Sequence, residues 1–152
     1  MSYSGSCHCG AIQYELSGEP KVVALCHCSD CRRSAGAPCV AWAMFPEASL
    51  TVSKGAPKTI NSSGTAMRSF CPECGTGLFY RNEAILAGIV DVQAATLDDP
   101  NALPPAIQIQ TAERLGWLCI CRYRPATICR DWLFVKISCD ARASGSDYNM
   151  EV

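Results

Sequence analysis

The sequence lacks three features that mark common classes of protein: a strong charge imbalance, a long apolar run and an apolar leader. Its net charge is −1 and its isoelectric point is near 6.1, so no basic surface for nucleic acid is expected. No segment approaches the roughly 18 apolar residues of a membrane-spanning helix, so no membrane partner is expected. The opening MSYSGSCHCG has no apolar stretch like that of a secretory signal. These absences predict a cytoplasmic protein.

Internal repeats and long helical patterns are also scarce, and short strand patterns take their place. The chain has 152 residues, of which 49% are apolar, which suits one domain with a substantial core. Apolar and polar side chains alternate over residues 11–16, whereas residues 22–26 and 39–45 are continuously apolar, as strands covered on both faces are. Further short strand-like runs occupy residues 50–54, 58–61, 66–70, 77–81, 85–90 and 106–111.

One short helix is predicted over residues 29–35. Ser29 is a suitable N-cap, and Gly36 can adopt the left-handed conformation that ends a helix. The predicted fold class is therefore mainly β, with two packed or strongly twisted sheets of short strands.

Cysteine is the residue that is unusually abundant. Twelve occur in the chain, and seven of them form tight clusters: Cys7, Cys9, Cys26, Cys28, Cys31, Cys71 and Cys74. A disulfide between partners one residue apart is strained, and a reducing compartment is expected for this chain. The clustering therefore favours metal binding over disulfides.

Two of the clusters are doublets, each followed by a glycine. In CPECG, Pro72 and Gly75 suit a tight turn that lets Cys71 and Cys74 grip one zinc ion. In SCHCG, Cys7 and Cys9 can chelate one metal in the same manner. Two doublets together supply the four sulfurs of a closed structural zinc site.

The third cluster is a triplet, in which Cys28 and Cys31 lie one helical turn apart and Cys26 ends the preceding strand. Seven sulfurs then divide most economically into a closed four-sulfur site and an open three-sulfur site. An open fourth position is what catalytic zinc keeps for water or substrate. Spacing leaves one alternative open, in which the first doublet joins two members of the triplet.

Several other residues receive structural interpretations. Cys39 opens an apolar strand and is expected to be a buried thiol. His8 and His27 lie between ligand cysteines, and we expect them near the metals or at the surface rather than as ligands. Trp42 and Trp117 are expected in the core or in the wall of a pocket.

The chain resembles the glutathione-dependent formaldehyde-activating enzymes, which are related to the centromere protein V domain. The resemblance is carried, within about residues 4 to 117, by GSCHCGAIQYEL, ALCHCSDCRRSAGAP, AWAMFPEASLTVSKGAPKTINS, FCPECGTGLFYR, AATLDDP and AIQIQT. It implies an Mss4-like zinc-binding fold of short twisted sheets, with one short helix near the second zinc. It also implies two zinc ions, one structural and held by Cys7, Cys9, Cys71 and Cys74, the other held by Cys26, Cys28 and Cys31 as the catalytic group.

The implied reaction joins glutathione to formaldehyde as S-(hydroxymethyl)glutathione, which is formally a carbon–sulfur lyase reaction run in reverse. Glutathione carries two carboxylates, so Arg32, Arg33 and Arg68 are candidate contacts by their positions near the clusters; the alternative is that they are solvated surface arginines. A non-catalytic glutathione carrier and a zinc-stabilised interaction module are the alternative functions. The sequence predicts no oligomeric state.

After Trp117 the resemblance stops, and we divide the chain into a zinc-binding domain, residues 1–117, and an atypical tail, residues 118–152. Our hypothesis is that the tail is a shifted reading frame or an extension from expression. Its segment DWLFVKIS could add a strand, and Cys119, Cys121 and Cys129 offer an alternative third metal site.

Overall fold

The computed structural model describes residues 1–118, so the predictions for Cys119, Cys121, Cys129 and DWLFVKIS lie outside the described residues. The chain divides into two units, Met1–Arg114 and Leu115–Val152, and the fold below is that of the first. Its strands are β1 (Ser2–Ser6), β2 (Gln13–Ser17), β3 (Val22–Cys26), β4 (Val40–Pro46), β5 (Leu50–Lys54), β6 (Lys58–Ser63), β7 (Ala66–Phe70), β8 (Gly77–Arg81), β9 (Ile89–Gln93) and β10 (Ile107–Ile109). The helical elements are α1 (Ser29–Ala35) and three 3₁₀ turns, η1 (Glu47–Ser49), η2 (Ala94–Thr96) and η3 (Thr111–Glu113).

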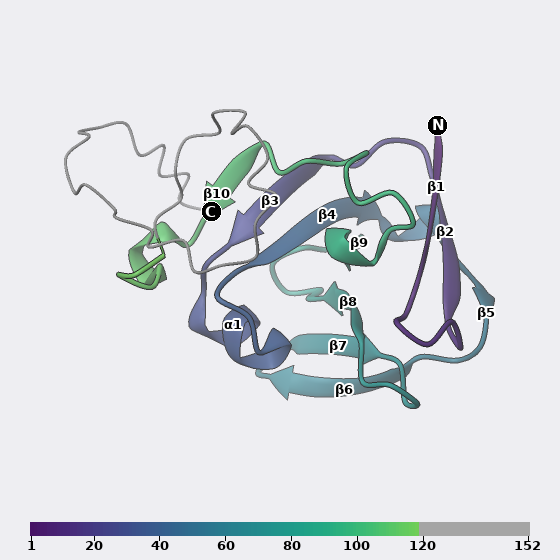
Figure 1. Cartoon of the computed structure of the whole chain (residues 1–152), viewed down its shortest axis with the longest axis horizontal. Helices are drawn as coiled ribbons and strands as arrows, with labels where there is room; N and C mark the ends of the chain where they lie inside the picture. The colour runs from purple at the N-terminus through teal and green to yellow at the C-terminus, as the bar shows by residue number, and fades with distance from the viewer. Residues whose placement is uncertain (119–152) are drawn as a thin grey trace, which may run out of the picture. The chain divides into compact units, whose positions relative to one another are not determined.

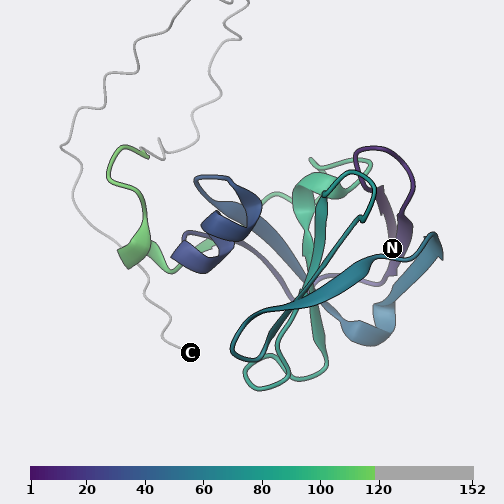
Figure 2. The same cartoon turned by 90° about the horizontal axis from the view of Figure 1, so that it is seen from below.

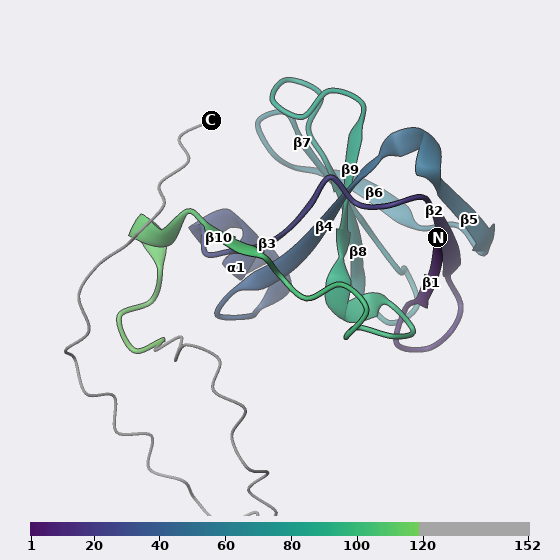
Figure 3. The same ribbon diagram turned by 90° about the horizontal axis from the view of Figure 1, so that it is seen from above.

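The strands form two sheets, which confirms the mainly β prediction (Figure 1). The smaller sheet has the order β1-β2-β5, and the larger has the order β10-β3-β4-β9-β8-β7-β6. All neighbouring pairs are antiparallel except β10 and β3, which run parallel. Figure 3 shows β10 lying beside β3.

The main core lies between the two sheets, because alternation places one row of apolar side chains from each sheet against the other. Tyr14 and Leu16 of β2 are each 1% exposed, and they share a cluster with Phe45 of β4 and Phe79 of β8. The rings of Tyr14 and Phe79 meet edge to face, with centroids 5.2 Å apart. The predicted inward face of residues 11–16 is thus confirmed.

The opposite face of the larger sheet carries a second apolar cluster, which includes the buried residues Cys26, Cys31, Val40 and Trp42. Helix α1 covers this face, and Figures 1 and 2 show it on the side away from the smaller sheet. The helix has the predicted bounds and ends at Gly36, whose φ of 61° is left-handed. The predicted N-cap was wrong: Cys28, not Ser29, caps the helix, since its sulfur accepts a hydrogen bond from the Cys31 amide. No helix in residues 1–118 is long and apolar enough to cross a membrane.

A small residue on β1 allows the smaller sheet to close on the core. Gly5 faces Tyr14 across the sheet, and a Cβ at Gly5 would overlap the Tyr14 ring and lie 2.6 Å from the Thr96 carbonyl oxygen. The Gly5→Ala variant is therefore expected to lose about 3 kcal/mol of unfolding free energy, as an overpacked core does. Urea unfolding of the zinc-loaded protein measures this loss.

Gly18→Ala is the matched control for this prediction. Gly18 has a φ of +79°, and a Cβ added there would meet nothing within 4 Å beyond its chain neighbours. Only the left-handed backbone is therefore penalised, by about 1 kcal/mol. Equal losses in the two variants would contradict the steric argument at Gly5.

Candidate metal centres

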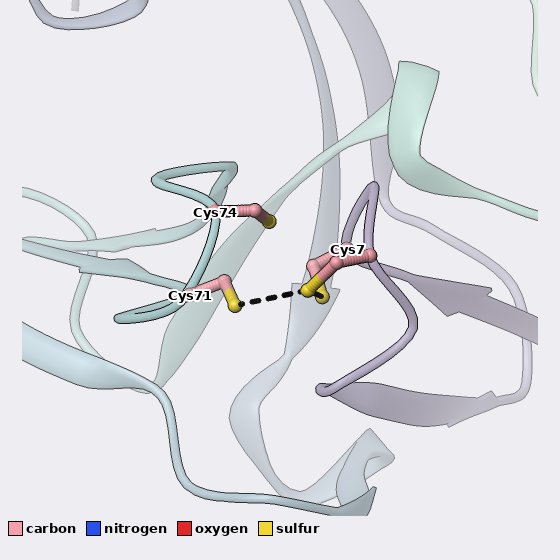
Figure 4. A group of neighbouring side chains, drawn as sticks. Cys7, Cys71 and Cys74 are labelled. Carbon is pink, nitrogen blue, oxygen red and sulfur yellow. Dashed lines mark hydrogen bonds between the residues drawn. The ribbon is translucent and has the colours of Figure 1, made fainter.

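Two turns from distant parts of the chain bring four sulfurs together. Cys7 and Cys9 lie in the turn between β1 and β2, and Cys71 and Cys74 lie in the turn between β7 and β8. Figure 4 shows Cys71 and Cys74 facing Cys7 across a short gap. All four sulfurs lie within 4.8 Å of one another, and we call this group the four-cysteine cluster.

The two turns have similar backbones, and glycine makes both of them feasible. The Gly10 amide donates to the Cys7 carbonyl at 3.0 Å, and the Gly75 amide donates to the Cys71 carbonyl at 2.9 Å. Both glycines have positive φ, 72° and 76°, which side chains disfavour. Each doublet is therefore followed by a residue that can reverse the chain and keep its two sulfurs on one side.

Hydrogen bonds favour the thiolate form at two of these sulfurs, those of Cys7 and Cys74. The Ile12 amide donates to the Cys7 sulfur at 3.2 Å. The hydroxyl of Thr76, 3.1 Å from the Cys74 sulfur, and backbone amides lower the pKa of Cys74 to about 5. Metal binding requires deprotonated sulfur, so these contacts suit a metal ligand.

The sulfur separations fit a tetrahedral zinc ion. Four sulfurs that each lie about 2.3 Å from one zinc ion are about 3.8 Å apart. The Cys7 and Cys9 sulfurs are 3.6 Å apart, and the Cys9 and Cys71 sulfurs are 3.9 Å apart. The four-cysteine cluster therefore has the donor set of a tetrahedral zinc site and could hold zinc without a further donor.

The second cluster consists of Cys26, Cys28 and Cys31, whose sulfurs also lie within 4.8 Å of one another. Cys26 ends β3, Cys28 caps α1, and Cys31 lies in the first turn of that helix. Within residues 1–118, no fourth cysteine, histidine or carboxylate belongs to this group, which we call the three-cysteine cluster. The structure therefore groups the first doublet with the second doublet and leaves the triplet by itself.

The histidines beside these cysteines do not belong to either cluster. His8 is exposed, and its backbone amide donates a hydrogen bond to the Thr76 hydroxyl at 3.2 Å. The His27 ring is fully buried, with Nε2 lying 3.0 Å from Gln108 Oε1. His27 thus links the cluster to β10.

Arg68 lies against the three-cysteine cluster. Its Nη2 is 2.6 Å from Asp30 Oδ2 and 3.6 Å from the Cys31 sulfur, and its guanidinium stacks 4.8 Å from the centroid of the Tyr80 ring. Hydrogen bonding with Cys26, assisted by Arg68 and opposed by burial, lowers the pKa of Cys31 to about 5. Arg68 is only 6% exposed, so it is no solvated surface residue.

The other two candidate arginines lie on α1. Arg32 donates from Nε to the His27 carbonyl at 2.9 Å, and it is half-buried. Arg33 is exposed. Their roles toward a glutathione carboxylate stay predictions.

Trp42, Tyr80 and Asp91 complete the surroundings of the three-cysteine cluster. Trp42 is 4% exposed, as expected, and its ring lies 6.0 Å from that of Tyr80. Trp117, which belongs to the second unit, differs from expectation, since it is 72% exposed. Sequence reasoning missed Tyr80 and Asp91. The signal for Asp91 was a charged residue inside the apolar run IVDV.

Asp91 is a buried carboxyl, 6% exposed, on β9. Burial and the charge of Cys31 raise the pKa of Asp91 to about 7, while Arg68 acts in the opposite direction. Perturbed carboxyl groups beside a cluster of metal-ligand type are characteristic of functional sites.

The part of the chain that matches a known family has nearly the same bounds as the first unit of the fold, Met1–Arg114. The family model described as glutathione-dependent formaldehyde-activating enzyme matches residues 2–113. A Halomonas elongata protein, whose name provisionally assigns it that activity, is 34% identical over 129 residues, covering 78% of this chain and 80% of its own.

Two other relatives extend the comparison. A Schizosaccharomyces pombe protein named as an uncharacterized lyase is 33% identical over 78 residues, which is 51% of this chain; the match spans 56% of the yeast protein's length. A crystal structure of a Rhodobacter sphaeroides protein is 27% identical, with a TM-score of 0.55, and the match covers 69% of this chain and 98% of that one.

Proposed function

Because the chain belongs to the glutathione-dependent formaldehyde-activating enzyme family, we propose that it joins glutathione to formaldehyde as S-(hydroxymethyl)glutathione. The three-cysteine cluster is the observation that carries this proposal, since it gathers three sulfurs and no fourth donor from residues 1–118. Such a group leaves room for one more sulfur, and glutathione offers one. The enzyme would thus be a carbon–sulfur lyase acting in the synthetic direction.

We assign the two clusters different roles. Cys7, Cys9, Cys71 and Cys74 would hold a structural zinc ion that joins the β1–β2 turn to the β7–β8 turn. Cys26, Cys28 and Cys31 would hold a second zinc ion, which when bound supplies a positive charge that keeps a substrate thiol deprotonated at neutral pH. A free thiol, with a pKa near ~8.5, is largely protonated there.

The residues around the three-cysteine cluster would assist the binding of a further anionic sulfur. Arg68 already donates to the Cys31 sulfur, and its positive charge offsets the added negative charge. Trp42 and Tyr80 provide apolar ring surfaces beside it. In the reaction the carbon–sulfur bond forms, the carbonyl π bond of formaldehyde opens, and one proton passes from sulfur to oxygen.

We further propose that the glutathione carboxylates contact Arg32 or Arg33 rather than Arg68. The Arg68 Nη2 is occupied by Asp30 and Cys31, whereas Arg33 is exposed and Arg32 is half-exposed. We also propose a reducing compartment such as the cytoplasm, because cysteines that bind metal must stay free of disulfides.

A non-catalytic glutathione carrier is the second candidate, and the all-sulfur composition of the three-cysteine cluster favours it. Three thiolates already donate strongly to a metal, which weakens its pull on an aldehyde oxygen, and a bound thiolate is a poorer nucleophile than a free one. This protein would then hold glutathione without accelerating its addition to formaldehyde.

Exchange spectroscopy by nuclear magnetic resonance separates the two candidates. In a mixture of formaldehyde and glutathione, the zinc-loaded protein is expected to accelerate exchange between the free aldehyde and the hydroxymethyl adduct. The chelator-treated protein is the control and is expected to give the rate of buffer alone. Saturable glutathione binding with no acceleration would reject the enzyme and support the carrier.

A further inference from the structure

The larger sheet buries a carboxyl group on the face that carries the three-cysteine cluster. Val90 and Val92 flank Asp91 on β9, and both are fully buried in the main core between the sheets. Side chains alternate along a strand, so Asp91 lies on the opposite face, which α1 covers. This is the face of Cys26, Cys31 and Trp42.

The sheet register places Asp91 beside the aromatic wall of that cluster. Asp91 pairs with Tyr80 of β8 on one side and with Met44 of β4 on the other. Trp42 lies two residues before Met44 on β4, and its ring is 6.0 Å from that of Tyr80, so the two rings meet over β9. The Asp91 carboxyl therefore lies at the base of the site.

One oxygen of this carboxyl lacks, among the described residues, the partner that a structural role would require. Within residues 1–118, Asp91 Oδ1 has no hydrogen-bond partner. Arg68, the nearby cation, donates through Nη2 to Asp30 and Cys31 and through Nε to Ser62. A buried polar group without a partner is costly, so its presence beside the cluster points to a ligand or a proton.

We propose that Asp91 accepts the proton that the glutathione thiol loses as its sulfur enters the three-cysteine cluster, and returns it to the aldehyde oxygen as the carbon–sulfur bond forms. This inference rests on the function proposed above. The transfer balances, because the thiol loses one proton, the carboxylate carries it, and the new hydroxyl receives it. No other reactant is needed.

The electrostatics of the site suit a group that changes its proton occupancy near neutral pH. The charged groups that face Asp91 are Cys31 from α1 and Arg68 from β7, and the phenol of Tyr80 lies next to it on β8. An additional anionic sulfur in the cluster would favour protonation of Asp91 further. Efficient proton donors and acceptors have pKa values close to the working pH, as that of Asp91, raised to about 7, is.

Proton counting on glutathione binding tests this proposal directly. Calorimetry of the full chain in two buffers of different ionisation enthalpy gives the number of protons released. A thiol with a pKa near ~8.5 is about 90% protonated at pH 7.5, so Asp91→Asn is expected to release nearly one proton. The wild-type protein is expected to release at least about half a proton less, because Asp91 keeps it.

Kinetics and a matched control complete the test. Asp91→Asn is expected to slow the exchange reaction by about 10²-fold or more and to flatten its pH profile near neutrality, with two zinc ions retained. Glu15→Gln removes an exposed carboxylate on β2 and is expected to match the wild type. If Asp91→Asn fails to fold, difference infrared spectroscopy of the wild type replaces it: glutathione should increase the protonated-carboxyl band.

The outcomes separate the role of Asp91 from the proposed function of the protein. Equal proton release and equal rates in wild type and Asp91→Asn would overturn the role of Asp91 and leave the proposed function standing. A wild type without acceleration would overturn the proposed function and the return of the proton to the aldehyde. In that case the proton count still decides whether Asp91 takes up the thiol proton.

Discussion

Replacement of Cys74 by serine is expected to unfold the first unit of the protein. Cys74 supplies one of four sulfurs that join the β1–β2 turn to the β7–β8 turn. Structural zinc contributes about 10–16 kcal/mol of apparent binding energy in small zinc domains, which is comparable to the whole stability of a typical domain. Native mass spectrometry and circular dichroism of the purified variant measure zinc content and secondary structure.

Cys39→Ser is the matched control for this experiment. Cys39 is a half-buried free thiol that belongs to neither cluster. Its replacement is expected to leave both zinc ions in place and to cost about 1 kcal/mol of stability. A folded Cys74→Ser protein with two bound zinc ions would contradict the structural role of the four-cysteine cluster.

Replacement of Cys28 by serine is expected to have the opposite pattern, with loss of activity and retention of the fold. The variant removes one sulfur from the three-cysteine cluster, so bound zinc should fall from two ions to one and exchange should fall to the rate of buffer alone. The helix should survive, because serine is itself a good N-cap and can accept the amide hydrogen bond that the Cys28 sulfur accepts now.

Thermal unfolding and zinc stoichiometry together check this second prediction. Cys28→Ser should show a cooperative thermal transition close to that of the wild type, whereas Cys74→Ser should show none. Two retained zinc ions with full activity would show that the three-cysteine cluster is not the working site. Loss of the thermal transition in Cys28→Ser as well would show that both clusters are structural.

The cysteine spacing predicted the groups of sulfurs well, because close spacing within a turn or a helix restricts where each sulfur can point. Cys28 and Cys31 are one turn apart on α1, and each doublet occupies a single turn. The pairing of distant doublets was the most economical division of seven sulfurs, and the structure has the same grouping. Alternation also predicted the buried face of β2.

The features that sequence reasoning missed depend on contacts between distant segments. β1, with the sequence SYSGS, has no strand-like composition, and it forms a strand because β2 pairs with it over five residues. Cys28 caps α1 in place of Ser29. The backbone amide of Ser29 donates a hydrogen bond to the Glu113 carboxylate at 2.7 Å. The burial of Arg68 and Asp91 follows from packing of α1 on the sheet, which no local pattern encodes.

The four-cysteine cluster has a consequence for the amount of protein in a cell. The Cys9 and Cys71 sulfurs are 3.9 Å apart although 62 positions separate them in the chain, so a bound ion acts as a cross-link that closes a long loop. Unlike a disulfide, this link responds to chelators rather than to reductants. Each tenfold fall in free zinc should cost about 1.4 kcal/mol of stability until the metal is lost. The abundance of the protein should then follow the zinc supply.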